Sequence, residues 1–242
     1  MSLNVNLSKR LEKVASYLPA GAFFADIGSD HAYLPCFVCL QDSSTTAVAG
    51  EINEGPYESA VHTVKQNNLE ARIDVRLGDG LAVLKEDEVH QVVIAGMGGA
   101  LIRNILETGK EKLKSVNQII AQPNIDARSV RRWFLANGYV LEDEAILEEN
   151  GHIYEILTAK RKIAVSPYLE EQLEKQLLFG PYLLKQPNAV FYKKWRHEYE
   201  KLQNVLSQME KAKTKDVEKI EQFNRELNWM EEILYDENKD NE

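Results

Sequence analysis

The chain has 242 residues, of which 44% are hydrophobic and 28% are charged, and its formal net charge is −9. This is the composition of an ordinary globular protein, and the length suits one domain with a large core plus an appendage. The sequence contains no apolar run of about 18 residues and no secretory leader, so we expect a cytoplasmic protein that does not enter a membrane. The acidic balance argues against a generally nucleic-acid-binding surface.

The two cysteines, Cys36 and Cys39, form an isolated C-x-x-C pair. A tetrahedral metal site needs four ligands, and the sequence offers neither a second pair nor a histidine pattern nearby. We therefore expect no metal. Free cysteine is usually buried, so the pair is interpreted as two packing residues one turn apart on a helix.

An N-terminal helix is predicted within residues 7 to 19, with Ser8 as its N-cap. Short apolar strands and helical segments then alternate along the chain, which indicates a parallel sheet covered on both faces. The strands are expected at residues 22 to 27, 45 to 51, 72 to 77, 90 to 95 and 117 to 122, and the helices at 32 to 41, 55 to 67, 99 to 108 and 126 to 137.

A change of pattern follows the fifth strand. Two strand-like runs are joined at Asn150-Gly151, a strong hairpin signal because both residues tolerate a positive φ. Five parallel strands closed by an antiparallel hairpin make the seven-stranded, Rossmann-like sheet of class I methyltransferases that use S-adenosylmethionine (SAM). The dinucleotide dehydrogenases instead continue with parallel units. We therefore predict an α/β fold of the methyltransferase type.

The last third of the chain reads as helical. Ser166 and Pro167 are expected to start a helix that stops at Gly180-Pro181. Two segments with heptad-like apolar spacing follow, and the short break between them predicts an antiparallel coiled-coil hairpin. The charged tail "DENKDNE" is expected to be disordered. These patterns divide the chain into a methyltransferase domain, residues 1–162, and a helical domain, residues 163–242.

Ligands of an open parallel sheet bind outside the carboxyl ends of its strands. Polar clusters follow the five predicted strands there: "DIGSDH", Glu51, "GDG", "GMGG" and "QPN". Gly28 allows a close backbone approach to the methionine part of SAM, and Glu51, 25 residues after Asp26, suits the ribose hydroxyls. Asp79 is a candidate acceptor for the adenine amino group, with Met97 beside the ring. The clusters together predict a SAM pocket.

The motifs "LSKRL", "ADIGSDHAYLP", "AGMGG" and "QPN" resemble those of the bacterial tRNA (adenine(22)-N1)-methyltransferases, and the resemblance covers essentially the whole chain. It implies a SAM-dependent enzyme that methylates N1 of an adenine in the tRNA D-arm. The cofactor contacts that it implies are Asp26, Gly28, Ser29, Asp30, His31, Glu51, Asp79, Gly80, Gly96 and Met97.

Methylation at N1 needs little acid–base machinery, because the nitrogen is a lone-pair nucleophile and the methyl of a sulfonium is already activated. Positive charge develops on the base, so a carboxylate or carbonyl beside it would be stabilising. The candidate catalytic residues are Asp30, Gln122 and Asn124. No NPPY-type clamp follows the fourth strand. The walls of the base pocket are therefore assigned to "QPN" and to "GMGG", including Gly98 and Gly99.

Local basicity would have to hold tRNA on an acidic protein. Residues 185 to 215 contain eight Lys and Arg against three Glu. Their cations could contact phosphate, but they could equally form a solvated face of a helix whose aromatic residues are core. The candidate RNA contacts are Lys193, Lys194 and Arg196 on the first coiled-coil arm, Arg128, Arg131 and Arg132 after "QPN", and Lys9 and Arg10 on the first helix.

Two alternatives stay open at this point. The same fold could methylate a small molecule or a protein, or the coiled coil could be a partner-binding module on an idle methyltransferase fold. We expect a monomer, although the sequence does not determine the oligomeric state.

Overall fold

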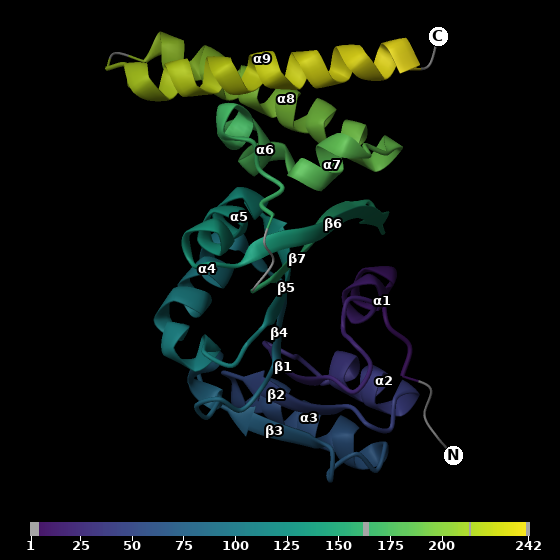
Figure 1. Ribbon diagram of the computed structural model, residues 1–242. Coiled ribbons are helices and arrows are strands. Elements are labelled where there is room, and N and C mark those ends of the chain that lie inside the picture. The colour runs from purple at the N-terminus through teal and green to yellow at the C-terminus, as the bar shows by residue number, and fades with distance from the viewer. Residues whose placement is uncertain (1–4, 162–164, 213, 241–242) are drawn as a thin grey trace.

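The computed structural model describes residues 5–161, 165–212 and 214–240, and a seven-stranded sheet forms its centre (Figure 1). The strands lie in the order β3-β2-β1-β4-β5-β7-β6. The first five are parallel, and β7 is antiparallel to both of its neighbours. Their bounds are β1 Phe23–Ile27, β2 Thr46–Glu51, β3 Ile73–Leu77, β4 Gln91–Gly98, β5 Gln118–Ile125, β6 Val140–Glu149 and β7 His152–Lys160.

Helices cover both faces of the sheet, as the continuous apolar strands predicted (Figure 1). Side chains of adjacent strand residues point to opposite faces, so Phe24 joins the core under α1 to α3 while Ala25 joins the core under α4 and α5. The helices are α1 Lys9–Ala15, α2 Tyr33–Gln41, α3 Glu54–Gln66, α4 Gly99–Thr108 and α5 Ala127–Ala136, with 3-10 turns η1 Gly80–Val83 and η2 Lys110–Leu113.

Most of the local predictions for the sheet domain are confirmed. The Ser8 hydroxyl caps α1 by accepting from the Leu11 amide, and Asn150 and Gly151 make the hairpin turn with φ of 51° and 78°. Cys36 and Cys39 are free and fully buried on α2. The predicted ends of β4 and β5 were wrong. Both strands continue three residues beyond the predicted limits and pair across register shifts. Most of "GMGG" and all of "QPN" are therefore held in paired strands rather than in loops.

The start of the helical region also differs from the prediction. Ser166 does not cap a helix: its hydroxyl accepts from the Tyr168 amide in a segment without regular secondary structure. Regular helix begins only at Leu173, after the 3-10 turn η3 Glu170–Gln172, and Gly180 at φ 92° ends it. The helices of this region are α6 Leu173–Phe179, α7 Pro181–Lys185, α8 Ala189–Lys211 and α9 Val217–Asp240.

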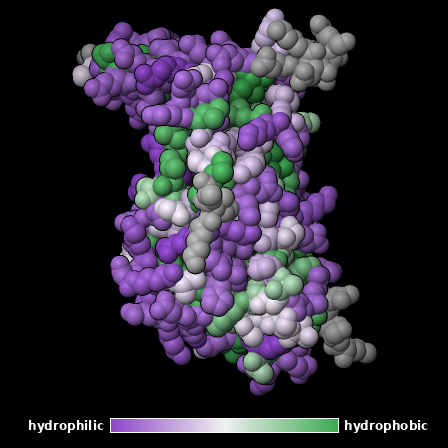
Figure 2. Space-filling model, in the orientation of Figure 1, coloured by the Kyte–Doolittle hydropathy of each residue, from purple (hydrophilic) through white to green (hydrophobic). Residues whose placement is uncertain are grey.

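The two long helices α8 and α9 form an antiparallel hairpin (Figure 1). Arg196 contacts Glu237 and Tyr199 contacts Glu231. A later residue on α8 therefore pairs with an earlier residue on α9, as antiparallel helices require. The predicted disorder of the tail was wrong as far as Asp240, where α9 ends; residues 241 and 242 lie outside the described residues. Figure 2 shows a mostly hydrophilic surface over α9, with hydrophobic residues gathered beneath it near α6 and α7.

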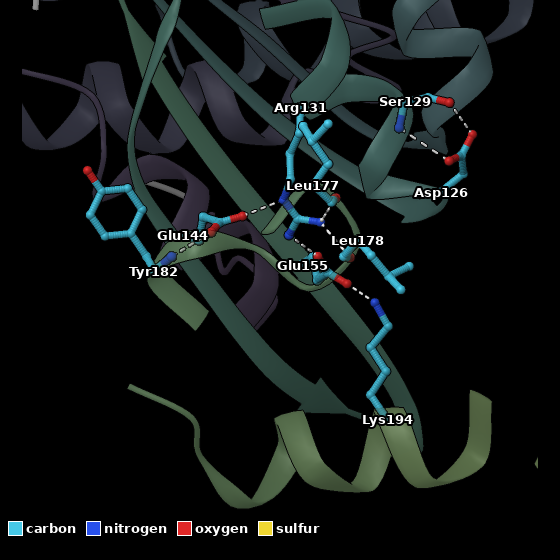
Figure 3. Close-up of polar contacts among 9 residues, drawn as sticks. All are labelled: Asp126, Ser129, Arg131, Glu144, Glu155, Leu177, Leu178, Tyr182 and Lys194. Carbon is cyan, nitrogen blue, oxygen red and sulfur yellow. Dashed lines mark hydrogen bonds and ion pairs between the residues drawn. The ribbon is translucent and has the colours of Figure 1, made fainter. Parts of the chain in front are cut away.

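A buried ion cluster joins these helices to the sheet (Figure 3). The Arg131 guanidinium on α5 is fully buried and donates to Glu144 on β6 at 2.6 Å and to Glu155 on β7 at 2.5 Å. It also donates to the carbonyl oxygens of Leu177 and Leu178 on α6. One cation therefore links α5, the β6–β7 hairpin and the helical region.

We expect Arg131→Met to lower the free energy of unfolding by about 3–5 kcal/mol, because the variant leaves the buried Glu144 carboxylate without a cation and Glu155 with Lys194 alone. Its neighbour Arg132 is the matched control, since it is half-exposed and pairs with Glu174 at the surface. Arg132→Met should cost less than about 1 kcal/mol. Urea unfolding of both variants makes the comparison, and equal losses would contradict the role given to the cluster.

Candidate active site

The loop after β1 brings a glycine and a methionine from different strands into contact. Gly28 has φ 71°, and the amides of Gly28 and Ser29 both donate to the Gly50 carbonyl of β2. A Cβ atom on Gly28 would lie 2.2 Å from the Met97 Cε of β4. Glycine adopts this positive φ without strain, whereas a larger residue would be strained and would displace the end of the Met97 side chain. Two of the predicted cofactor residues are therefore adjacent in space.

Asp26 lies at the end of β1 behind this loop. Its carboxylate accepts from the Ser29 hydroxyl at 2.6 Å, and only 4% of the residue is exposed. Burial raises the pKa of Asp26 to about 7, against the lowering effects of the Ser29 hydrogen bond and the Arg10 charge. The pair shapes the floor of the site.

Glu51 lies at the end of β2, on the edge of the sheet where the parallel strands end, which we call the rim. One carboxylate oxygen, Oε1, accepts from the backbone amide of Asp30, and burial raises the pKa of Glu51 above its ordinary value. Within the described part of the chain, no donor contacts the other oxygen, Oε2. Asp30 itself has φ 57°, and its exposed carboxylate lies 3.5 Å from the imidazole of His31. Glu51 thus fixes the loop and keeps an acceptor for a ligand.

The residues after β3 complete this side of the rim. The Gly78 amide donates to the Glu51 carbonyl at 2.7 Å, which ties the "GDG" segment to β2. Asp79 is exposed, and Gly80 has φ 51° beside Ile105 of α4. The predicted cofactor residues from four strands therefore share one edge of the sheet.

The opposite wall is a set of linked carboxamides at the ends of β4 and β5. Gln122 Oε1 accepts from the Gly96 amide at 3.0 Å, and Gln122 Nε2 donates to Asn124 Oδ1 at 3.1 Å. Asn124 Nδ2 then donates to the Gly96 carbonyl at 2.8 Å. Asn124 is exposed while Gln122 is fully buried, so Asn124 alone of the two amides faces outward.

Two further residues complete this wall. Arg10 reaches it from α1 and donates to Gln122 Oε1. Its guanidinium also lies over the ring of Tyr154 on β7, 5.2 Å from the centroid. Tyr154 was missed in the sequence, where it is one of several aromatic residues in the hairpin and carries no motif.

Three sequence predictions need correction here. Gln122 is buried, so it cannot touch a substrate and acts only through its neighbours. Gly99 is also buried, and a Cβ atom there would lie 2.0 Å from the Asp126 carbonyl oxygen, so it serves close packing rather than substrate contact. Arg131 is fully buried in the ion cluster and cannot reach RNA. Gly98, by contrast, is half-exposed at the N-cap of α4.

The other basic residues predicted to bind RNA on α5 and α8 all have carboxylate partners. Lys193 and Arg196 are more than half exposed and pair with Glu148 and Glu237. Lys194 contacts Glu155 under the helix, and burial, with the charge of Arg131, lowers the pKa of Lys194 to about 7 (Figure 3). The remaining pairs are Arg128 with Glu226 and Arg132 with Glu174.

A cavity of about 660 Å³ lies between the rim and the α8–α9 hairpin. Pro123 and Asn124 line it on the side of the sheet, and His197 and Lys201 line it on α8. Asn124 therefore belongs both to the rim and to this cavity. Its position makes the cavity an extension of the carboxamide wall, which we also call the acceptor wall.

No group of His, Cys, Asp or Glu side chains that could hold a metal ion is found among the described residues. Over the same residues, no helix is both long and apolar enough to cross a membrane.

Comparison with known proteins bears on the site as a whole. The family model described as "TrmK: tRNA (adenine(22)-N(1))-methyltransferase" matches residues 24–232. The tRNA (adenine(22)-N(1))-methyltransferase of Bacillus subtilis is 46% identical over 95% of this chain and 96% of its own length.

Solved structures agree with the sequence match. The crystal structure of Bacillus subtilis TrmK has a TM-score of 0.89 at 44% identity and covers 95% of this chain and 99% of its own. A Streptococcus pneumoniae relative, crystallised in complex with S-adenosyl-L-methionine, has a TM-score of 0.81 at 40% identity and covers 95% and 100%. The resemblance seen in the motifs is confirmed, and the chain belongs to the tRNA (adenine(22)-N(1))-methyltransferase family.

Proposed function

We propose that this protein transfers the methyl group of SAM to N1 of adenine 22 in the D-arm of tRNA. The observation that carries the proposal is the convergence of two walls on one rim. The glycine and carboxylate wall of β1 to β3 faces a carboxamide wall built on β4 and β5, and Gly96-Met97 lies between them. Because tRNA is the substrate, we also infer that the protein acts in the cytoplasm.

The first wall fits SAM on two structural grounds. Gly28 keeps the backbone free of a side chain at a positive φ, which suits close approach by a ligand, and Glu51 retains a free acceptor oxygen for a ribose hydroxyl. Asp26, Ser29, Asp30 and His31 would line the methionine side, and Asp79, Gly80 and Met97 the adenine side. Bound here, SAM supplies an electrophilic methyl group on a sulfonium.

The second wall would receive the base. Asn124 offers an amide oxygen to the exocyclic amine of adenine, where positive charge develops as N1 is methylated. No general base is needed for this step, so the main task of the site is alignment. The N1 edge is hidden in a paired or stacked base, and extruding the base costs a few kcal/mol.

The helical region is proposed to guide the tRNA, with the catalytic domain ending near residue 162. The cavity beside Asn124 is large enough to admit a flanking nucleotide. Lys193 and Arg196 support this role because exposed ion pairs contribute little and can exchange a carboxylate for a phosphate. The fixed hairpin would hold these cations at a constant distance from the rim.

The reaction is tested by incubating tRNA with SAM and the protein and analysing the nucleosides by mass spectrometry. We expect 1-methyladenosine from a tRNA with adenine at position 22 and none from the same tRNA with guanine there. Product that persists with guanine at position 22 would place the reaction elsewhere on the molecule.

Glu51→Ala should weaken SAM binding at least about tenfold, because the variant removes a carboxylate acceptor and loosens the loop that it holds. Glu54→Ala is the matched control, since Glu54 is exposed in the first turn of α3. Titration calorimetry measures both. Similar affinities for the two variants would remove Glu51 from the cofactor site.

Replacing Lys193 and Arg196 together by Ala should weaken tRNA binding and reduce the slope of log affinity against log salt by about one to two. Lys114→Ala is the control, because Lys114 is an exposed, paired cation far from the helical hairpin. Filter binding at several salt concentrations gives the slopes. A slope equal to that of the control would show that these cations only solvate their helix.

A further inference from the structure

Arg10 is held in the site by contacts of its own helix, α1, with the strands β5, β6 and β7. The Ser8 hydroxyl caps α1, and the Lys9 amide donates to the Glu149 carboxylate of β6 at 2.7 Å. From this anchored turn, the Arg10 side chain crosses to Gln122 on β5 and stacks on Tyr154 of β7. The guanidinium is therefore engaged at the acceptor wall and is only half-exposed.

The contact with Gln122 reinforces the orientation of two amides. The two ends of a carboxamide have similar shapes, so only their hydrogen-bond partners decide which end is oxygen. Arginine can only donate, and the Gly96 amide can only donate, so together they hold Gln122 Oε1 in place. Gln122 Nε2 must then face Asn124 and donate to its oxygen. Gly96 and Arg10 hold this order together, because the Gly96 carbonyl accepts from Asn124 Nδ2 while Arg10 is the second donor to Gln122 Oε1.

We propose that Arg10 is a positioning residue for methyl transfer, which fixes Gln122 and through it the Asn124 oxygen that accepts from the amino group of adenine. This inference rests on the proposed function and reassigns Arg10, which the sequence suggested as an RNA contact. An amide oxygen has two lone pairs, and among the described residues only Gln122 donates to Asn124 Oδ1. The second lone pair suits the amine of adenine and repels the carbonyl oxygen of guanine.

A phosphate contact would behave differently from a positioning residue. A phosphate contact contributes to tRNA affinity and to its salt dependence but not to the rate once tRNA is saturating. A positioning residue for the base contributes to the rate at saturation and leaves the salt slope unchanged. The two roles are therefore separated by measuring binding and single-turnover rates on the same variants.

We expect Arg10→Met to lower the single-turnover rate at saturating tRNA and SAM by about tenfold, the effect of one misplaced hydrogen bond. Its tRNA affinity and salt slope should equal those of the unmodified protein. Arg10→Lys keeps a donor without the planar stack on Tyr154 and should fall between the two. Lys114→Met is the control, because Lys114 is an exposed, paired cation outside both walls of the site.

A substrate change tests the same link without altering the protein. Replacing adenine 22 by purine removes the amino group, and this should slow the unmodified protein more than it slows Arg10→Met. Such coupling between an enzyme change and a substrate change isolates an interaction that both share. The melting temperature and the SAM affinity of each variant are measured as controls for the fold and for the cofactor wall.

Two results would overturn the inference: an equal penalty for purine in both proteins, or a weaker, less salt-dependent tRNA affinity with the rate at saturation preserved. The second would return Arg10 to the phosphate contacts. Failure of the proposed function is a separate outcome, because the unmodified protein would then produce no 1-methyladenosine at all.

Discussion

The parallel pairing of β1 to β5 is the constraint on which the site depends. It brings the carboxyl ends of five strands to one edge, although their segments are spread over about a hundred residues of sequence. The pairing of β4 with β5 continues beyond the usual end of the strands, through Met97 and Pro123. This extension holds the backbone of Gly96 in place, so that its amide and carbonyl anchor Gln122 and Asn124.

The helical region is tied to this sheet by charge as well as by apolar packing. Phe179, Phe191 and Trp195 share a core with Ile146 of β6, and the Arg131 cluster lies beside it. A buried cation with two carboxylates is costly to separate, because each partner left alone keeps its desolvation penalty. The α8–α9 hairpin is thereby held against the edge strands instead of swinging on a linker.

The sequence was sufficient for the sheet because apolar runs and the Asn150-Gly151 turn are local signals. It was misleading where glycine and proline stand in strands: residues 96 to 98 and Pro123 read as loop but are held by neighbouring strands. The burial of Arg131 could be predicted in part from its spacing. It lies on the same helix face as Ala127 and Phe134, and all three residues are buried. Its partners on β6 and β7 could not be deduced, nor could the contact of Arg10 with Gln122, because these depend on tertiary packing alone.

The placement of α1 has a consequence for synthesis of the chain. Tyr17 donates to Asp143, Gln118 donates to the Tyr17 carbonyl, and Arg10 lies over Tyr154, so the first helix docks on segments made more than a hundred residues later. In a growing chain on the ribosome, all residues of the cofactor wall lie within the first hundred. The carboxamides of the acceptor wall follow by residue 124, but Tyr154, on which Arg10 stacks, emerges only with the closing hairpin, so the wall lacks this support until then.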